Sequence, residues 1–330
     1  MPPFFSAPSG ALCRAAARAA MLVLSVLAVH GNVAAAWAAP RWDVPAEVSQ
    51  GRAFVVRATD TAPFAASVVW RDKTIPLAVT ASPASGVWEG RVMLAVPIDA
   101  KGALHLTLKD DEGSRTVAVA ALSVPWHEDR LTVAPKYVTP PAEVQAQIKR
   151  DGERNARVLT SVRPEAEWTL PFRRPVKGSI SGPFGGRRVF NGQPRAPHKG
   201  TDMRGPTGTP AHAVAAGVVV LAEPQYYSGN VIMVDHGQGV ISMYGHLSAF
   251  DVKVGDRVER GQVIGRVGAT GRVTGPHLHL GLMVQGVAVD AMPLYAEPLR
   301  VVGGPTPEDK IARPAPRNKT AAPSPAGNQS

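Results

Sequence analysis

The chain has 330 residues, enough for two domains with sizeable cores. It is rich in glycine (32) and proline (31), while aromatic residues make up only 6%. This composition favours short strands and turns over long helices. The formal net charge of +10 suits nucleic acid, anionic lipid or an acidic polymer as partner. Because the basic residues are scattered, with no dense block interleaved with aromatics, we expect no nucleic-acid partner.

Residues 1–39 predict a signal peptide. Arg14 and Arg18 precede an apolar run, Ala19–Val29, and small residues follow around Ala36-Trp37-Ala38, as at a cleavage site. Cleavage would remove both arginines and no acid, which leaves a net charge of +8. The run is short for a membrane span, so we expect no stable span after cleavage, although an uncleaved anchor stays open. The single cysteine, Cys13, lies before this run, so a mature chain would rely on its core or on a metal.

Residues 40–127 alternate in the manner of short strands separated by turns. The expected strands are Ala53–Arg57, Ser67–Arg71, Val87–Val96, Leu104–Leu108 and Thr116–Val124. Their close spacing predicts an immunoglobulin-like β-sandwich in architecture, without the cysteine pair of true immunoglobulin domains. This part shows no chemistry, and we interpret His105 and His127 as structural or solvated.

Residues 128–165 predict a linker that contains one helix. Pro140 and Pro141 precede Ala142–Leu159, in which four apolar residues lie roughly on one face: Val144, Ile148, Ala156 and Leu159. At the other end of the chain, residues 301–330 are rich in proline, alanine, serine and asparagine. Such a segment cannot bury enough apolar surface to order itself, so we expect a disordered tail.

Residues 166–300 hold most of the histidines between short β-type runs and glycine turns. His277-Leu-His279 places two imidazoles on one face of a strand, which is a good base for a metal site. Pro197 and Gly200 favour an extended segment in which His198 and Asp202 share a face. With one histidine of the pair, they would give zinc three protein ligands and leave a fourth position open, as in catalytic zinc sites.

A further histidine, His246, follows a glycine at the end of the β-type run Val240–Tyr244. Together with the second histidine of the pair, it would offer a ring close to zinc-bound water. We interpret His236 as structural and His212 as surface or barrel lining. Five residues could line a substrate groove: Asn191, Arg195, Tyr226, Tyr227 and Asn230.

Four motifs occur in one order: Gly182-Pro-Phe-Gly185, His198-x-x-x-Asp202, Tyr244-Gly-His246 and Gly275-Pro-His-Leu-His279. Over roughly residues 170–295 this series resembles that of the lysostaphin/LytM-type zinc endopeptidases, metallopeptidase family twenty-three, which cut peptidoglycan cross-bridges or stem peptides. The resemblance implies an antiparallel β, LytM-like barrel-sandwich domain and thus a mainly β chain. It also implies that His198, Asp202 and His279 bind zinc, and that His246 and His277 are catalytic.

The implied reaction is metal-assisted peptide hydrolysis, with zinc acidifying a water and polarising the carbonyl. His246 or His277 would take the proton, and which ring does so stays open. Leu280-Gly-Leu lacks the aromatic residue often seen there, which affects substrate fit more than chemistry. With a signal peptide, the resemblance places the protein in a bacterial periplasm or at the cell surface, with peptidoglycan as substrate. The bond cleaved and any protein partners stay open.

Two rival functions remain. The glycine-punctuated segment Val252–Gly265 resembles turns of biotinyl and lipoyl carrier domains, but no lysine stands at a hairpin tip as a carrier requires. A non-catalytic activator of other wall hydrolases would usually have lost metal ligands, and here all are present. Digestion of purified cell wall, with and without a chelator, distinguishes the endopeptidase from these two alternatives, because a carrier or an activator would not hydrolyse the wall by itself.

Overall fold

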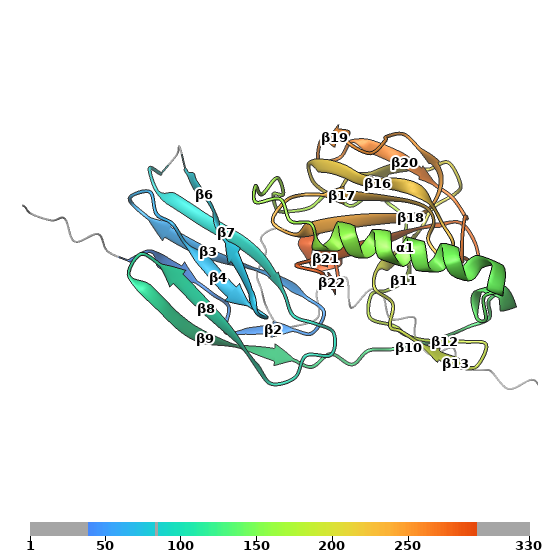
Figure 1. Ribbon diagram of the computed structural model, residues 1–330, viewed down its shortest axis with the longest axis horizontal. Coiled ribbons are helices and arrows are strands. Elements are labelled where there is room, and N and C mark those ends of the chain that lie inside the picture. The colour runs from blue at the N-terminus through green and yellow to red at the C-terminus, as the bar shows by residue number, and fades with distance from the viewer. Residues whose placement is uncertain (1–38, 83–84, 296–330) are drawn as a thin grey trace, which may run out of the picture. The chain divides into compact units, whose positions relative to one another are not determined.

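The computed structural model describes residues 39–82 and 85–295 (Figure 1). Nearly all of the predicted signal peptide, and all of the predicted tail at 301–330, lie outside these residues. Within them the chain is mainly β with one long helix, as expected. No helix in the described ranges combines the length and the apolar composition needed to cross a bilayer.

The N-terminal part forms two sheets. The first has the order β1 (Arg41–Asp43), β3 (Ala53–Asp60), β7 (Trp88–Ala95) and β6 (Ala78–Ala81). The second has the order β2 (Glu47–Ser49), β9 (Gly113–Leu122), β8 (Ala103–Asp110), β4 (Ser67–Trp70) and β5 (Lys73–Pro76). Both sheets contribute to one hydrophobic cluster, in which Phe54 of β3 meets Trp70 of β4 edge to face at 5.5 Å.

All five strands expected in this part are present, with ends shifted by a few residues. The strand β3 is buried on both faces. Its even-numbered residues, such as Phe54 and Val56, pack between the two sheets, whereas Ala53 and Val55 belong to the cluster that continues into residues 168–294. The odd-numbered face therefore joins this part to the C-terminal core.

The connecting segment contains β10 (Glu128–Leu131), η1 (Pro135–Tyr137) and α1 (Ala142–Thr160). The predicted helix is confirmed and ends one residue later than expected. Val158 and Leu159 pack against the sheet beside Leu221 and Val231, and Figure 1 shows α1 lying across the strands β16 to β18. Of the four apolar residues expected on one face of the helix, Val144, Ile148 and Leu159 are partly buried, whereas Ala156 is exposed.

The C-terminal part is a largely antiparallel sheet with the order β11-β14-β21-β18-β17-β16-β19, to which β15, β20 and β22 attach. The bounds along this order are β11 (Ile180–Gly182), β14 (Thr201–Arg204), β21 (His277–Val284), β18 (Val240–Phe250), β17 (Gly229–Asp235), β16 (Gly217–Gln225) and β19 (Arg257–Val258). The attached strands are β15 (Pro210–His212), β20 (Val263–Val267) and β22 (Val287–Val289), and η2 (Met292–Tyr295) follows.

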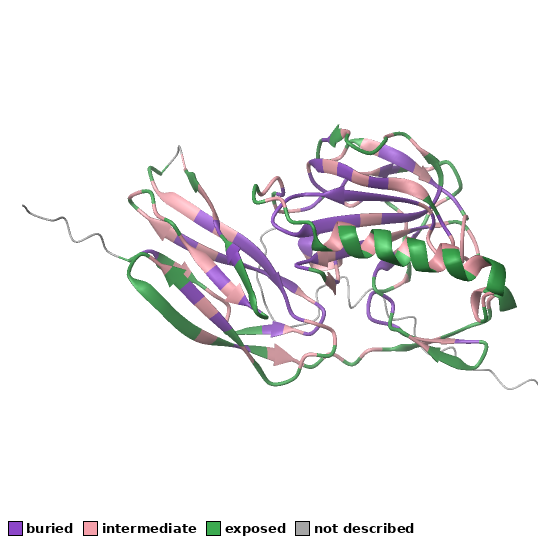
Figure 2. Cartoon of the chain, viewed as in Figure 1, coloured by how far each residue is buried: buried purple, intermediate pink, exposed green. Residues whose placement is uncertain are grey.

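Both faces of this sheet are covered at its centre. Along β17, Ile232 and Val234 enter one hydrophobic cluster, while Val231 and Met233 enter the other, beneath α1. Figure 2 shows the buried residues concentrated on β17 and β18. Beside the sheet, the hairpin β12 (Arg187–Phe190) and β13 (Gln193–Arg195) is extended by β10, which pairs parallel to β12.

Candidate active site

Three adjacent strands, β14, β21 and β18, bring the candidate residues together. Asp202 of β14 lies opposite His279 of β21, and His279 lies opposite Gly245 of β18 on its other side. His277, two residues before His279, has its side chain on the same face of β21. The register of the sheet therefore brings together side chains that are distant in sequence. Asp202 and His279, for example, are 77 residues apart.

His198 reaches the same place from irregular backbone, because β14 begins only at Thr201. Its main chain is held by two hydrogen bonds, from the Gly185 N–H to the His198 carbonyl and from the His198 N–H to the Gly186 carbonyl, each 2.9 Å. The ring is almost fully buried, with Nδ1 at 3.1 Å from the Pro183 carbonyl oxygen. Since Nδ1–H donates to that carbonyl, Nε2 carries the free lone pair.

Three ligand-type atoms converge in this way. His198 Nε2 lies 3.0 Å from His279 Nδ1 and 3.1 Å from Asp202 Oδ1, and His279 Nδ1 lies 2.8 Å from Asp202 Oδ1. The second carboxylate oxygen of Asp202 accepts a hydrogen bond from Arg188 at 3.1 Å, which orients Oδ1 towards the two rings. These three side chains form a group that could hold a metal ion.

Two glycines of the motifs leave the room that this group needs. A Cβ at Gly200 would lie 2.6 Å from Cε1 and Nε2 of the His279 ring, and a Cβ at Gly182 would lie 2.6 Å from Asp202 Oδ2. Neither contact is sterically acceptable without a shift of the ring or the carboxylate. The glycines in these motifs thus follow from the close approach of backbone to ligand side chains.

His246 occupies a β-bulge, so β18 does not end at Tyr244 as expected but continues to Phe250. Tyr244 pairs with Ile232 and Leu247 with Asn230, so Gly245 and His246 together face the single residue Val231. His246 has a φ of +63°, in the left-handed region that non-glycine residues seldom adopt. Bulges of this kind redirect a side chain. Here the redirected ring meets the His277 ring at 4.8 Å between centroids.

Both of these rings are tied at Nδ1. His246 Nδ1 lies 2.8 Å from the Thr270 carbonyl oxygen, and His277 Nδ1 lies 2.9 Å from the Gly275 carbonyl oxygen. A neutral imidazole that donates through Nδ1 keeps Nε2 as a proton acceptor. His277 Nε2 stands 3.7 Å from Asp202 Oδ1, at the edge of the three-ligand group.

Burial sets the protonation of this region. Burial, with a smaller contribution from nearby histidines, lowers the pKa of His198 to about 4 and that of His246 to about 3. Burial would raise the pKa of the Asp202 carboxyl, but its hydrogen bonds with His198 and His279 outweigh burial and hold that pKa well below its usual range. At neutral pH His198 is therefore a neutral imidazole and Asp202 a carboxylate, the protonation states that bind a divalent ion.

The other histidines lie apart from this group. His236 is fully buried, with Nδ1 at 2.7 Å from the Ala216 carbonyl oxygen and Nε2 at 2.7 Å from Ser242 Oγ, in agreement with a structural role. His212 on β15 is half-buried and binds the Pro175 carbonyl oxygen at 3.0 Å. His105 and His127 are exposed.

Three of the five suggested groove residues contact the connecting segment. Asn191 bonds the backbone of Val133 through both side-chain atoms, and Arg195 donates to the Val138 carbonyl at 2.9 Å. Tyr226 donates to the Lys136 carbonyl at 2.8 Å. The connecting segment thus runs along one flank of the site.

Sequence reasoning missed two arginines beside the site, Arg188 and Arg272. Arg188 pairs with Asp202, and the Arg272 guanidinium lies 4.6 Å from the centroid of the Tyr227 ring. Neither arginine belongs to a motif, and nothing in their local sequence distinguishes them from other arginines. Only the fold brings them beside His198, Asp202 and His279.

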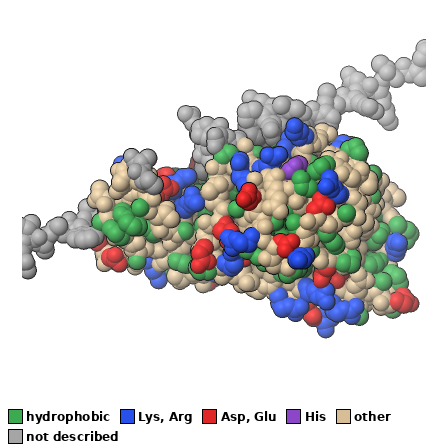
Figure 3. All heavy atoms as spheres, turned by 90° about the horizontal axis from the view of Figure 1, so that it is seen from above, with side chains coloured by type: hydrophobic (Ala, Val, Ile, Leu, Met, Phe, Trp, Pro, Cys, Tyr) green, Lys and Arg blue, Asp and Glu red, His purple; other side chains and the backbone are tan. Residues whose placement is uncertain are grey.

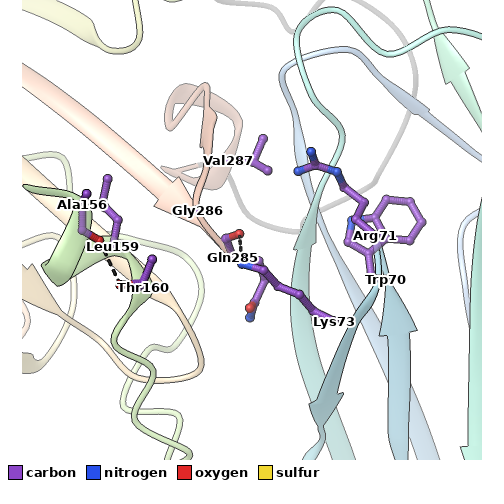
Figure 4. Close-up of a pocket in the computed structure, with 9 residues that line it drawn as sticks. All are labelled: Trp70, Arg71, Lys73, Ala156, Leu159, Thr160, Gln285, Gly286 and Val287. Carbon is purple, nitrogen blue, oxygen red and sulfur yellow. Dashed lines mark hydrogen bonds between the residues drawn. The ribbon is translucent and has the colours of Figure 1, made fainter.

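A separate cavity of about 350 Å³ lies between the β4–β5 turn, the end of α1 and the β21–β22 turn. Figure 4 shows Lys73, which donates to the Gln285 carbonyl at 3.1 Å, between Trp70 and the end of α1. None of the residues that line this cavity belongs to the histidine group, so the candidate chemistry lies elsewhere.

Two histidines, an aspartate and two further imidazoles on a β scaffold define a metallopeptidase-type site, and comparisons with known proteins agree. The model of peptidase family M23 matches residues 196–291. A crystal structure from Pseudomonas aeruginosa, assigned to peptidase M23, superimposes with a TM-score of 0.55 at 30% identity, covering 72% of this chain and 92% of that one. The chain belongs to peptidase family M23.

Two curated relatives match over the same part of the chain. Peptidoglycan DD-endopeptidase ShyA of Vibrio cholerae is 48% identical over 123 residues, which is 36% of this chain and 29% of that protein. DD-carboxypeptidase/endopeptidase Mpg of Neisseria meningitidis is 41% identical over 129 residues, 39% of this chain and 28% of that protein. This chain therefore matches less than a third of the length of these relatives.

Proposed function

We propose that this protein is a zinc-dependent endopeptidase that hydrolyses peptide cross-links or stem peptides of bacterial peptidoglycan. The observation that carries the proposal is the convergence of His198, Asp202 and His279 within 2.8–3.1 Å of one another, with two imidazoles against them. Membership of the M23 family and the names of the relatives support the same activity and substrate.

The donor set fits zinc. Zinc lies about 2 Å from each donor, which places the donors of a tetrahedral site about 3.3 Å apart. The three observed separations are within a few tenths of an ångström of that value. We assign His198, Asp202 and His279 as the ligands. When bound, zinc supplies a Lewis acid that acidifies a water molecule and polarises a carbonyl group.

We assign the catalytic proton transfers to His246 and His277. Each keeps Nε2 as an acceptor, because Nδ1 is bonded to a backbone carbonyl. One ring can take the proton of the attacking water, and a ring so protonated can return it to the leaving amine. Burial lowers the pKa of His246 to about 3, so this ring is neutral at physiological pH.

The proposed site of action is outside the cytoplasm, in the periplasm or at the cell surface. The basic signal-like segment at residues 1–39 and the wall-acting relatives support this assignment. The mature charge of +8 would favour approach to an anionic wall, an effect that salt screens.

For the layout, we propose a signal peptide (1–39), an immunoglobulin-like β-sandwich (40–127), a linker with a helix (128–165), the zinc peptidase domain (166–300) and a tail (301–330). Two sheets around one core support the sandwich. The Pseudomonas structure covers 72% of the chain, more than residues 166–300 can supply, so its similarity extends into the N-terminal part.

Digestion of purified peptidoglycan by the zinc-loaded protein tests the function. We expect soluble muropeptides whose masses identify the cleaved peptide bond, and no release after a chelator removes the metal. Release that persists without metal, or no release by protein with one zinc per chain, would contradict the proposal. In the second case, stimulation of another wall hydrolase would favour the activator instead.

A further inference from the structure

Three arginines gather on the flank of the metal-ligand group. Arg188 and Arg272 both stand over the Phe190 ring, with guanidinium carbons 5.8 Å and 5.0 Å from its centroid. Arg272 also lies 4.6 Å from the centroid of the Tyr227 ring, so two aromatic rings hold its guanidinium. Arg195 lies on the adjacent strand β13, where it faces Arg188 of β12 in register. We call these three residues the arginine cluster.

The arginine cluster is short of negative charge. Among the described residues its one carboxylate contact is Asp202, which accepts from Arg188. Arg195 donates only to neutral oxygens, those of Val138 and Gln193. Burial lowers the pKa of Arg272, and the charges of Arg188 and Arg195 also act to lower it. When a divalent ion occupies the neighbouring ligands, the positive charge here increases.

The cluster also has unused donors. The Nε–H of Arg188 is buried and has no hydrogen-bond partner. The guanidinium of Arg272 contacts two rings but makes no hydrogen bond within the described part of the chain, although it is half-buried. The donors of Arg272 are partly exposed and therefore open to an incoming acceptor, whereas the Nε–H of Arg188 is buried.

The position of Arg272 links the cluster to the reacting groups. Arg272 lies two residues after Thr270, whose carbonyl oxygen holds His246, while Arg188 holds Asp202. The cluster thus spans one flank of the site from the ligand side to the proton-transfer side. In the space-filling view, Lys and Arg side chains are spread over the face that is shown, among acidic and hydrophobic side chains (Figure 3).

We propose that the arginine cluster is a subsite that binds a carboxylate of the peptide substrate near the scissile bond. Planar guanidinium groups match a carboxylate in a bidentate manner, and aromatic rings on their faces leave the N–H edges free. The inference rests on the proposed peptidase function. It adds that the enzyme distinguishes a free carboxylate from its amide. The carboxylate can come from a side chain or from a chain end.

Arg272 is the residue to test, because Arg188 also orients a metal ligand. The substrates are cross-linked stem-peptide dimers in three forms: unmodified, with amidated side-chain carboxylates, and with amidated C-terminal carboxylates. For the zinc-loaded wild type we expect one amidated form to show a KM at least about tenfold higher, with kcat little changed. That form identifies the source of the carboxylate.

The Arg272→Gln variant should raise KM for the unmodified dimer to a similar degree and no longer discriminate between the forms. Arg272→Lys, which keeps the charge but loses the planar fork, should be intermediate. Arg150→Gln, the same charge change on the exposed side of α1, should behave as wild type. All variants should retain one zinc per chain. Equal loss on all three forms would instead mark Arg272 as structural and overturn the proposal, as would a wild type that does not discriminate.

Binding separates this proposal from the proposed function. Calorimetric titration of zinc-loaded His246→Ala with the same dimers measures the subsite without turnover. We expect His246→Ala to bind one amidated form more weakly than the unmodified dimer, and the double variant with Arg272→Gln to bind both forms equally. This result supports the carboxylate subsite even if no dimer is cleaved. Equal binding of all forms rejects the subsite, even if the wild type cleaves every dimer.

Discussion

His246 and His277 face one another with ring centroids 4.8 Å apart, and each ring is fixed by a backbone carbonyl at Nδ1. The two carbonyls belong to Thr270 and Gly275, on the same connection between β20 and β21. One loop therefore sets the orientation of both rings, although one histidine comes from a bulge in β18 and the other from the start of β21.

Removing one of these rings should separate chemistry from metal binding. We expect His246→Ala to retain one zinc per chain, because no ligand atom is lost, and to lose at least about 100-fold in peptidoglycan hydrolysis. Zinc analysis and muropeptide release measure the two effects. His105→Ala, at an exposed position on β8, is the control and should change neither. Loss of zinc from His246→Ala would mean that the ligand assignment is incorrect.

Removing a proposed zinc ligand should abolish metal binding as well as hydrolysis. His279→Ala leaves His198 and Asp202 as a two-ligand site, so we expect zinc binding and hydrolysis to be lost together. Zinc should raise the melting temperature of the wild type, since a ligand bound only by the folded state stabilises it, and should leave that of the variant unchanged. Full zinc occupancy in His279→Ala would count against the assignment.

The glycine beside the His279 ring offers a subtler test. In Gly200→Ala the new methyl group would lie 2.5 Å from the Leu280 carbonyl oxygen and 2.6 Å from ring atoms of His279, so the backbone here must shift and the ring with it. We expect at least a tenfold loss of zinc affinity with an unchanged circular dichroism spectrum. Gly152→Ala, in α1 with nothing within 4 Å, should instead stabilise the protein by about 1 kcal/mol. Unchanged zinc affinity in Gly200→Ala would show that the ring tolerates displacement.

The buried His236 should make stability depend on pH. Burial lowers its pKa from 6.5 to about 4 in the folded state, so between these values the unfolded chain binds more protons. Stability from the neutral ring is therefore complete above pH 6.5 and falls as pH drops towards 4, by about 3 kcal/mol in all. Asp235, Arg163 and Glu167 face the same ring and modify this value.

Urea denaturation of wild type and His236→Gln between pH 7.5 and 4.5 measures this effect, because the other titrating groups are common to both proteins. The free energy of unfolding should fall more steeply with decreasing pH in the wild type. Parallel pH profiles for the two proteins would show that His236 does not titrate in this range.

Much of the fold was predictable because the hydrophobic patterns are strong. The two prolines before Ala142 and the apolar spacing after it predicted the first residue of α1 correctly and its last residue to within one position. The strands β5 and β6 were missed, since each has four residues and little alternation, and they form by pairing with longer neighbours. The immunoglobulin-like classification of the two sheets remains a prediction.

The roles of the five candidate site residues stay a prediction that rests on the resemblance of their motifs to those of a known family. Their supporting contacts could not be predicted from the sequence. His198 was expected in an extended run shared with Asp202, yet it lies outside β14 and is held by Gly185 and Gly186, whose role depends on tertiary contact. The bulge at His246 and the approach of Arg188 depend likewise on register and packing between distant segments.

The parallel pairing of β10 with β12 has a practical consequence for dissecting the chain. A fragment that begins at residue 166 would lack β10 (Glu128–Leu131). The strand β12, which carries Arg188, would then have one edge without a hydrogen-bonded neighbour. An autonomous catalytic fragment should start before Glu128, and one cut later should aggregate through its open edge.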